Sequence, residues 1–232
     1  QNAPKKSMSI NPKYRQQTFY EGKGSFFYKK IQKIIIDKRN EFFNLFLNST
    51  DYSNDKSVID IGSTPSIDSE QNIFLEKIKN NKNVTCLSTQ DCRILKQKFK
   101  NIKNTIIGDG KNTMLNDNSF DIVHSNATIE HVGPFDNQLS FVKELVRISK
   151  ESVFLQTPNR FHPIDFHTIL PFIHWLPKNI HRKILKNFNL DFYSKEENLN
   201  LLSIKDLKNI CEILKLKKYK IFKIKLFFFT SN

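Results

Sequence analysis

Ser57-Val-Ile-Asp-Ile-Gly62 begins a series of short apolar segments that decides the fold of this chain. Four further segments follow, at residues 83–88, 104–109, 120–126 and 152–159, and each ends in a small or polar residue. Stretches with apolar residues at helical spacing separate most of them. Buried strands that alternate with helices predict an α/β fold with a mostly parallel sheet, helices on both faces, and a ligand cleft at the carboxyl ends of the strands.

Size and composition favour a single domain. A chain of 232 residues with 38% hydrophobic residues supports one well-buried core and is too short for two. The three cysteines, Cys86, Cys92 and Cys211, fit neither a disulfide framework nor a paired-ligand spacing, which predicts a reducing compartment. No run approaches the ~20 apolar residues that span a bilayer, so we expect a soluble, cytoplasmic protein.

The formal net charge of +14 invites a nucleic-acid interpretation, because basic surfaces attract phosphates. The lysines are scattered along the chain among many Asn, Ile and Phe residues, and no arginine-rich or aromatic-interleaved basic stripe stands out. We therefore expect a small-molecule partner rather than a nucleic acid.

Residues 1–50 are predicted to be an addition to the main domain at 51–232. The first 24 residues are polar and irregular. Residues 25–47 carry apolar side chains at helical spacing, with Ser25 in the position of a helix cap. We expect this helix to cover the domain.

The C-terminal third changes character. Residues 161–190 form an aromatic, histidine-rich insertion whose three prolines exclude one continuous helix. Residues 203–214 are predicted to be a helix capped by Ser203. The alternating pattern at 218–227 predicts a strand with one wet face.

Two motifs resemble those of class I S-adenosylmethionine-dependent methyltransferases. Residues 115–132, Leu-Asn-Asp-Asn-Ser-Phe-Asp-Ile-Val-His-Ser-Asn-Ala-Thr-Ile-Glu-His-Val, resemble the signature around the fourth strand of that family. Residues 156–168, Gln-Thr-Pro-Asn-Arg-Phe-His-Pro-Ile-Asp-Phe-His-Thr, resemble a subgroup met in bacterial cell-surface polysaccharide and other small-molecule pathways. The resemblance implies a Rossmann-like fold with a seven-stranded type of sheet, methyl transfer, and S-adenosylmethionine as cofactor.

The resemblance also places the cofactor at the carboxyl ends of the first four strands. Asp60 and Gly62 match the acidic residue and the glycine turn after the first strand, and Asp109 matches the acidic residue that meets the adenine amino group. The expected cofactor-binding residues are Asp60, Gly62, Ser63, Thr64, Ser88, Asp91, Asp109, Gly110, Ser125, Asn126 and Ala127.

Two of these positions depart from the family pattern. Thr64 stands where a second glycine is usual, and Ser88 stands where an acidic residue usually meets the ribose hydroxyls. Either Asp91 takes over the ribose contact or the affinity for the cofactor is lowered. Loss of such a contact costs about 1.5–3 kcal/mol, or roughly one to two decades of affinity.

His131 and His167 are the candidate bases for deprotonating a methyl acceptor, because imidazole titrates near neutral pH. A structural hydrogen bond explains His131 equally well. Asp165 is suited to orienting an imidazole or accepting a substrate hydroxyl. Asn159, Arg160 and His167 are expected to bind substrate, with the Arg160 guanidinium facing a carboxylate or phosphate. We expect no metal site, because the histidines lack carboxylate or thiolate partners at fixed spacing.

The expected reaction is methyl transfer to oxygen, rather than nitrogen or carbon, of a small molecule or glycan precursor. Two alternatives stay open: a nucleic-acid methyltransferase, and a binding or scaffold protein that keeps the fold without catalysis. The aromatic stretch at 169–176, followed by several basic residues, resembles either a lid over the acceptor or an anchor giving weak contact with a membrane surface. The pattern does not predict an oligomeric state.

Overall fold

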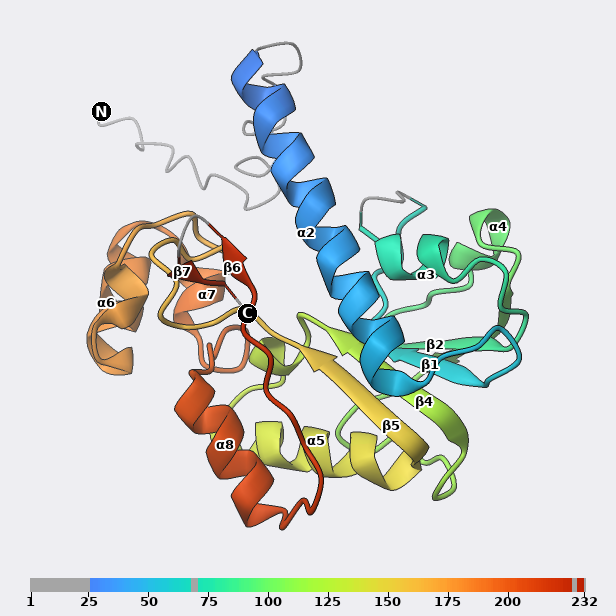
Figure 1. Cartoon of the computed structure of the whole chain (residues 1–232). Helices are drawn as coiled ribbons and strands as arrows, with labels where there is room; N and C mark the ends of the chain where they lie inside the picture. Colours follow the sequence, from blue (N-terminus) through green and yellow to red (C-terminus); the bar gives the residue numbers. More distant parts are fainter. Residues whose placement is uncertain (1–25, 68–70, 227–228, 232) are drawn as a thin grey trace, which may run out of the picture.

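The centre of the molecule is a parallel five-stranded sheet. A computed structural model describes residues 26–67, 71–226 and 229–231. The strands are β1 (Val58–Ile61), β2 (Val84–Ser88), β3 (Ile102–Ile107), β4 (Phe120–Asn126) and β5 (Ser149–Gln156), in the order β3-β2-β1-β4-β5 (Figure 1). The chain builds one half outward from β1 and then crosses to β4, so the strand order reverses between β1 and β4. This is the predicted Rossmann-like arrangement, and ligands bind where the order reverses.

Helices cover both faces of the sheet, as predicted. Helices α2 (Phe26–Thr50), α3 (Ile73–Lys77) and α4 (Leu95–Lys98) lie on one face, and α5 (Phe135–Ile148) and α8 (Ile204–Ile213) lie on the other (Figure 1). Strand alternation divides the core accordingly: Val58 packs with Phe46 of α2, whereas Ile59 packs with Phe141 of α5. Helix α8 begins with the predicted cap, because the Ser203 side chain and Asp206 form a reciprocal capping box.

The predicted seven-stranded type of sheet is not confirmed, because the described residues give the main sheet five strands. Strands β6 (Lys225–Leu226) and β7 (Phe229–Thr230) instead pair with each other in a separate antiparallel ribbon. The prediction of a strand over 218–227 is therefore wrong for most of its length. Tyr219 and Phe222 remain exposed, since no strand of the main sheet lies beside them in the part of the chain described.

The insertion after β5 is broken into short elements, as its prolines predicted. It contains the 3-10 turn η2 (Ile173–Trp175) and the helices α6 (Lys178–Asn187) and α7 (Asp191–Ser194), and it lies beyond the carboxyl ends of β4 and β5 (Figure 1). Another 3-10 turn, η1 (Ile129–His131), follows β4 on the same side. The domain division at residue 50 stays a prediction. The predicted arm and the Ser25 cap lie outside the described residues.

Candidate active site

Two tight glycine positions shape the carboxyl edge of the sheet. Gly62, directly after β1, has a φ of +93°, and a Cβ there would lie 2.0 Å from Oγ1 of Thr128 in the loop after β4. A Cβ on Gly110 would lie 2.5 Å from the Phe141 ring. Only glycine allows the turn after β1 to approach the loop after β4, and the loop after β3 to approach α5, this closely.

Three of the expected cofactor residues turn their side chains into the protein. The carboxylate of Asp60 accepts hydrogen bonds from Nδ1 of His124 at 2.6 Å and from the hydroxyl of Ser63 at 2.6 Å. The Ser125 hydroxyl donates to the carbonyl of Ile61 at 2.8 Å. These contacts tie β4 to the end of β1 and fix the turn, so any cofactor contact from these side chains stays a prediction.

Asp109 is placed differently, because its carboxylate remains half-exposed at the end of the loop after β3. Burial alone raises the pKa of Asp109, but the hydrogen bonds and charge of Lys111 outweigh burial and lower it. The Lys111 ammonium lies 2.9 Å from one carboxylate oxygen. Asp109 is therefore an accessible carboxylate, suited to a ligand that carries an amino group.

The two ribose-site candidates differ from each other. Ser88 is buried at the end of β2, and its hydroxyl accepts a hydrogen bond from the Gln90 backbone at 3.3 Å. The carboxylate of Asp91 is already paired with Arg93, with the closest contact at 2.6 Å. A ribose contact from Asp91 would have to compete with this exposed ion pair.

The remaining expected cofactor residues lie on the open side of the edge. Thr64, Asn126 and Ala127 are exposed, and Ala127 has a φ of +49°. Small side chains, the exposed amide of Asn126 and the Asp109 carboxylate suit a ligand with amino and hydroxyl groups, and S-adenosylmethionine carries both. The residues present therefore fit this cofactor.

Beyond β4 and β5, the structure joins the three predicted catalytic residues into one cluster. Nδ1 of His167 donates to the Asp165 carboxylate at 3.2 Å, and Nε2 of His167 lies 3.1 Å from Nε2 of His131. Nδ1 of His131 donates to the backbone carbonyl of Asn198 at 2.6 Å. The prediction from sequence did not include a fourth member, Glu130, whose Oε1 lies 3.7 Å from Nε2 of His167.

Buried charge sets the electrostatics of this cluster. Burial alone lowers the pKa of His167, but the hydrogen bond with Asp165 and the charge of Glu130 outweigh burial and raise it. Burial raises the pKa of Asp165, and the contact with His167 more than compensates, bringing it to about 2. Asp165 is thus an ionised partner that holds the His167 ring in place, as predicted for an orienting residue.

Glu130 itself is fully buried. Its Oε2 accepts a hydrogen bond from the Thr157 hydroxyl at 3.0 Å, whereas its Oε1 has no hydrogen-bond partner among the described residues. The Glu-His pair after the fourth strand was visible in the sequence. Its inward placement was not, because that depends on how the insertion folds over β5.

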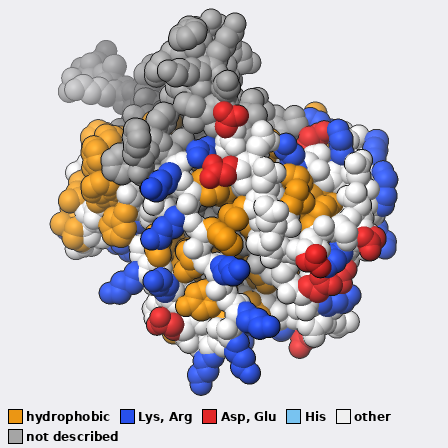
Figure 2. Space-filling view, in the orientation of Figure 1, with side chains coloured by type: hydrophobic (Ala, Val, Ile, Leu, Met, Phe, Trp, Pro, Cys, Tyr) orange, Lys and Arg blue, Asp and Glu red, His pale blue; other side chains and the backbone are white. Residues whose placement is uncertain are grey.

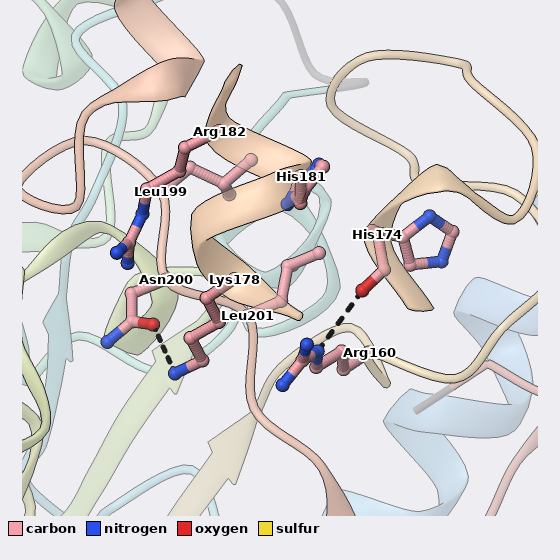
Figure 3. A pocket seen from close by; sticks show the side chains of 8 residues that line it. All are labelled: Arg160, His174, Lys178, His181, Arg182, Leu199, Asn200 and Leu201. Carbon is pink, nitrogen blue, oxygen red and sulfur yellow. Dashed lines mark hydrogen bonds between the residues drawn. The ribbon is translucent and has the colours of Figure 1, made fainter. Parts of the chain in front are cut away.

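Arg160 lies beside this cluster in a small cationic cavity, which Figure 3 shows from close by. Its guanidinium donates to the carbonyls of His174 and Leu176 at 3.1 and 2.9 Å. The lining residues are Arg160, His174, Lys178, His181, Arg182, Leu199, Asn200 and Leu201. The backbone of Asn200 bonds to the Glu130 carbonyl at 2.7 Å, so the cavity adjoins the cluster.

The cations of this cavity have few acidic partners. Lys178 donates to the Asn200 side chain at 2.6 Å. In the part of the chain that the structure describes, only Arg182 of these cations pairs with a carboxylate, that of Glu196, at 2.8 Å. Burial, with the nearby charge of Arg160, lowers the pKa of Lys178, and burial lowers the pKa of His181 to about 4. Crowded, partly buried cations of this kind favour binding of an anion.

The second predicted substrate residue, Asn159, has a different environment. Its amide nitrogen donates to the Thr230 carbonyl at 3.0 Å, and its side-chain oxygen accepts from the Phe161 backbone at 3.1 Å. Asn159 thus holds the β6–β7 ribbon against the end of β5, and its role toward substrate stays a prediction.

An exposed apolar surface covers the insertion. Figure 2 shows hydrophobic side chains gathered over α6 and the segment around it. Its exposed residues include Phe161, Phe166, Phe172, Trp175, Ile180, Phe188 and Phe192. Within the described residues, no helix combines the length and apolar character that a membrane crossing requires.

Comparison with known proteins supports the assignment of the fold. Residues 70–155 match the family model described as "Methyltransferase domain". A putative Zn-dependent alcohol dehydrogenase from Rhodobacter sphaeroides is similar with a TM-score of 0.51 and 11% identity, covering 73% of this chain and 76% of that one. The YcgJ protein from Bacillus subtilis has a TM-score of 0.50 and 13% identity, and the match covers 75% of this chain and 67% of that one. A SAM-dependent methyltransferase from Archaeoglobus fulgidus has a TM-score of 0.48 and 17% identity, and the match covers 82% of this chain and 74% of that one.

No protein with curated annotation matches the chain. At such low identities the solved structures show the fold alone. The matched family segment contains β2 to β4, all of β5 but its last residue, and the Glu130–His131 turn. The matched residues therefore form a methyltransferase domain, and S-adenosylmethionine is its cofactor.

Proposed function

We propose that the protein methylates a hydroxyl oxygen of an anionic small molecule or glycan precursor. The observation that carries this proposal is the pair of facing Nε2 atoms of His131 and His167 at the carboxyl edge of the sheet. In each ring Nδ1 donates to an oxygen, so Nε2 of the neutral imidazole holds a lone pair. An acceptor hydroxyl that reaches these atoms can give up its proton there.

S-adenosylmethionine supplies an electrophilic methyl group on a positively charged sulfur. The protein then has to position the acceptor oxygen and remove its proton. Asp165 orients His167 through Nδ1 and stabilises the imidazolium that forms when Nε2 takes the proton. The carbonyl of Asn198 holds the His131 ring in the matching orientation.

The anionic part of the acceptor is proposed to lie at Arg160. The cavity beside the histidine cluster brings Arg160, Lys178 and Arg182 together around a small space. A phosphate or carboxylate there would offset their mutual repulsion. Glycan precursors that carry a phosphate or a sugar acid meet this requirement, which agrees with the resemblance to polysaccharide pathways.

The experiment is methyl transfer from labelled S-adenosylmethionine to matched acceptor pairs, such as sugar phosphates or nucleotide sugars and their uncharged counterparts. We expect methylation of the charged member of a pair at oxygen. Replacing Arg160 with Met should raise the KM for that acceptor by about 10–100-fold, because one charge-assisted contact is lost. Equal turnover of both members, or methylation of amines alone, would contradict the proposal.

The exposed apolar residues of the insertion favour a second acceptor source, a lipid-linked glycan precursor presented at a membrane surface. Basic residues of α6 lie close to this surface and would face anionic headgroups. Sedimentation with anionic vesicles tests this contact. Failure to co-sediment at low salt would rule out the membrane source and leave the soluble acceptor.

Two competing outcomes separate the alternatives left open by the sequence. Salt-sensitive RNA binding together with RNA methylation would favour a nucleic-acid methyltransferase. An intact fold that binds neither S-adenosylmethionine nor its demethylated product would favour a scaffold protein.

A further inference from the structure

We propose that Glu130, His131 and His167 form a binding site for a divalent transition-metal ion of the zinc class. One oxygen of Glu130 and one ring nitrogen of each histidine lie within 4.8 Å of one another. Two imidazoles and one carboxylate are a common ligand set for such ions, with a further coordination position left open. The sequence predicted no metal site. The spacing along the chain does not reveal this one, because His167 belongs to the insertion and lies far along the chain from Glu130 and His131.

The first argument concerns the two histidine rings. His131 donates its Nδ1 proton to the Asn198 carbonyl, and His167 donates its Nδ1 proton to the Asp165 carboxylate. Metal-binding histidines commonly have this arrangement, in which the outer nitrogen donates to a carbonyl or carboxylate and the inner nitrogen keeps its lone pair. Two lone pairs 3.1 Å apart repel each other unless a cation lies between them. An ion about 2.0–2.1 Å from each nitrogen fits this spacing.

The second argument concerns Glu130. Its side chain is fully buried, and Oε1 has no hydrogen-bond partner among the described residues. The other oxygen is held by the Thr157 hydroxyl, which leaves Oε1 facing His167 at 3.7 Å. A buried carboxylate oxygen without a partner carries a large desolvation cost. Coordination to a metal ion would remove that cost.

The third argument is charge balance. Glu130 and Asp165 bring two carboxylates into a buried cluster. The two imidazoles, each with a lone pair on Nε2, add no positive charge to compensate these carboxylates. A divalent cation would leave no uncompensated charge, and buried charges are stable only when they are compensated.

The ion would also bear on catalysis, and this extension rests on the proposed function. A metal bound by three protein ligands lowers the pKa of an oxygen ligand at its open position. In the loaded protein the metal would therefore replace imidazole as the group that activates the acceptor hydroxyl, and the released proton would pass to solvent. Metal binding itself does not depend on the identity of the acceptor.

The test is titration of the chelator-treated 232-residue chain with Co²⁺, followed by displacement with Zn²⁺. We expect one equivalent of Co²⁺ per chain, with visible absorption typical of nitrogen and oxygen ligands and without a thiolate-to-cobalt band. Absence of binding by the folded protein at millimolar Co²⁺ and Zn²⁺ would overturn the proposal. A thiolate band would do so too, because it would place the ion at the cysteines.

Variants assign the ligands. His131→Ala and His167→Ala should each lower Zn²⁺ affinity by at least about tenfold, and Asp165→Asn, which acts through His167, by about 10–100-fold. His181→Ala is the matched control, since it removes a histidine outside the cluster, and should leave the affinity unchanged. Unchanged affinity in both cluster variants would overturn the site. If a variant fails to fold, the Co²⁺ spectrum of the unmodified protein still shows whether the ion is bound by nitrogen and oxygen ligands.

Methyl-transfer assays of the metal-loaded and the chelator-treated protein, beside the Co²⁺ titration, separate this inference from the proposed function. Metal binding without methyl transfer to any acceptor would leave the site standing and overturn the function. Methyl transfer by a protein that binds no metal would do the reverse.

Discussion

Two histidine–aspartate pairs in this protein have the same chemistry and different surroundings. Asp60 and His124 lie in the core, where the His124 ring stacks on Phe74 with ring centroids 3.5 Å apart. Asp165 and His167 lie beyond the carboxyl ends of β4 and β5, where the free nitrogen of His167 faces His131. A histidine–aspartate pair alone therefore does not indicate a functional site. What differs is whether the second ring nitrogen is enclosed by packing or faces another functional group.

The largest effect should follow from breaking the enclosed pair. We expect His124→Ala to lower the free energy of unfolding by about 3–5 kcal/mol, because it removes a ring packed among aromatic side chains and leaves the Asp60 carboxylate without its partner. Urea unfolding measures this. A variant as stable as the unmodified protein would show that the pair is not a structural element.

The second pair should respond in the opposite way. We expect His167→Ala to lower methyl transfer by about 10²–10⁴-fold, the usual contribution of a positioned base or its equivalent. The affinity for S-adenosylhomocysteine should stay the same, and stability should fall less than in His124→Ala. His167→Gln is the conservative control for packing. Full activity in both variants would show that His167 has no role in catalysis, and that the two His–Asp pairs do not differ in function.

A smaller effect should come from a buried carboxylate with no histidine partner. Glu144 of α5 accepts hydrogen bonds from Arg147 and Thr113, and these, led by Arg147, lower its pKa to about 2 against the burial that raises it. Because the pKa is lower in the folded state, Glu144 stabilises the fold above about pH 4.5, and this contribution is lost as the pH falls toward 2.

Thermal unfolding of Glu144→Gln and of the unmodified protein across this range tests the sign. We expect the variant to be less stable by on the order of 1 kcal/mol at neutral pH, and the difference to shrink in acid. A stability difference that grows in acid would contradict the assignment.

The sequence predicted the fold well where burial repeats regularly. The segment at 120–126 coincides with β4, because a strand buried in a parallel sheet is a short apolar run with clear ends. The alternation at 218–227 misled, because a pattern alone does not supply a neighbouring strand. Between β2 and β3, one of the stretches with apolar residues at helical spacing forms only the short helix α4, since few of its side chains are buried.

The candidate site was predictable only in part. His131, Asp165 and His167 were identified one by one as residue types suited to proton transfer. The contacts among these three side chains, and the position of Glu130 beside them, depend on how the insertion packs beyond the end of β5. No local sequence pattern predicts that packing. Likewise, the partner of Asp60 is 64 residues away, and only the pairing of β1 with β4 brings the two together.

The central claim, that the carboxyl edge at the reversal of strand order binds S-adenosylmethionine, is tested most directly by calorimetric titration with S-adenosylhomocysteine. The protein should bind it, and Asp109→Ala should weaken binding by at least about tenfold, because an accessible carboxylate contact is lost. Asp136→Ala, which removes an exposed carboxylate on α5, should bind as the unmodified protein does. No binding by the folded protein, or equal affinity in Asp109→Ala, would contradict the account.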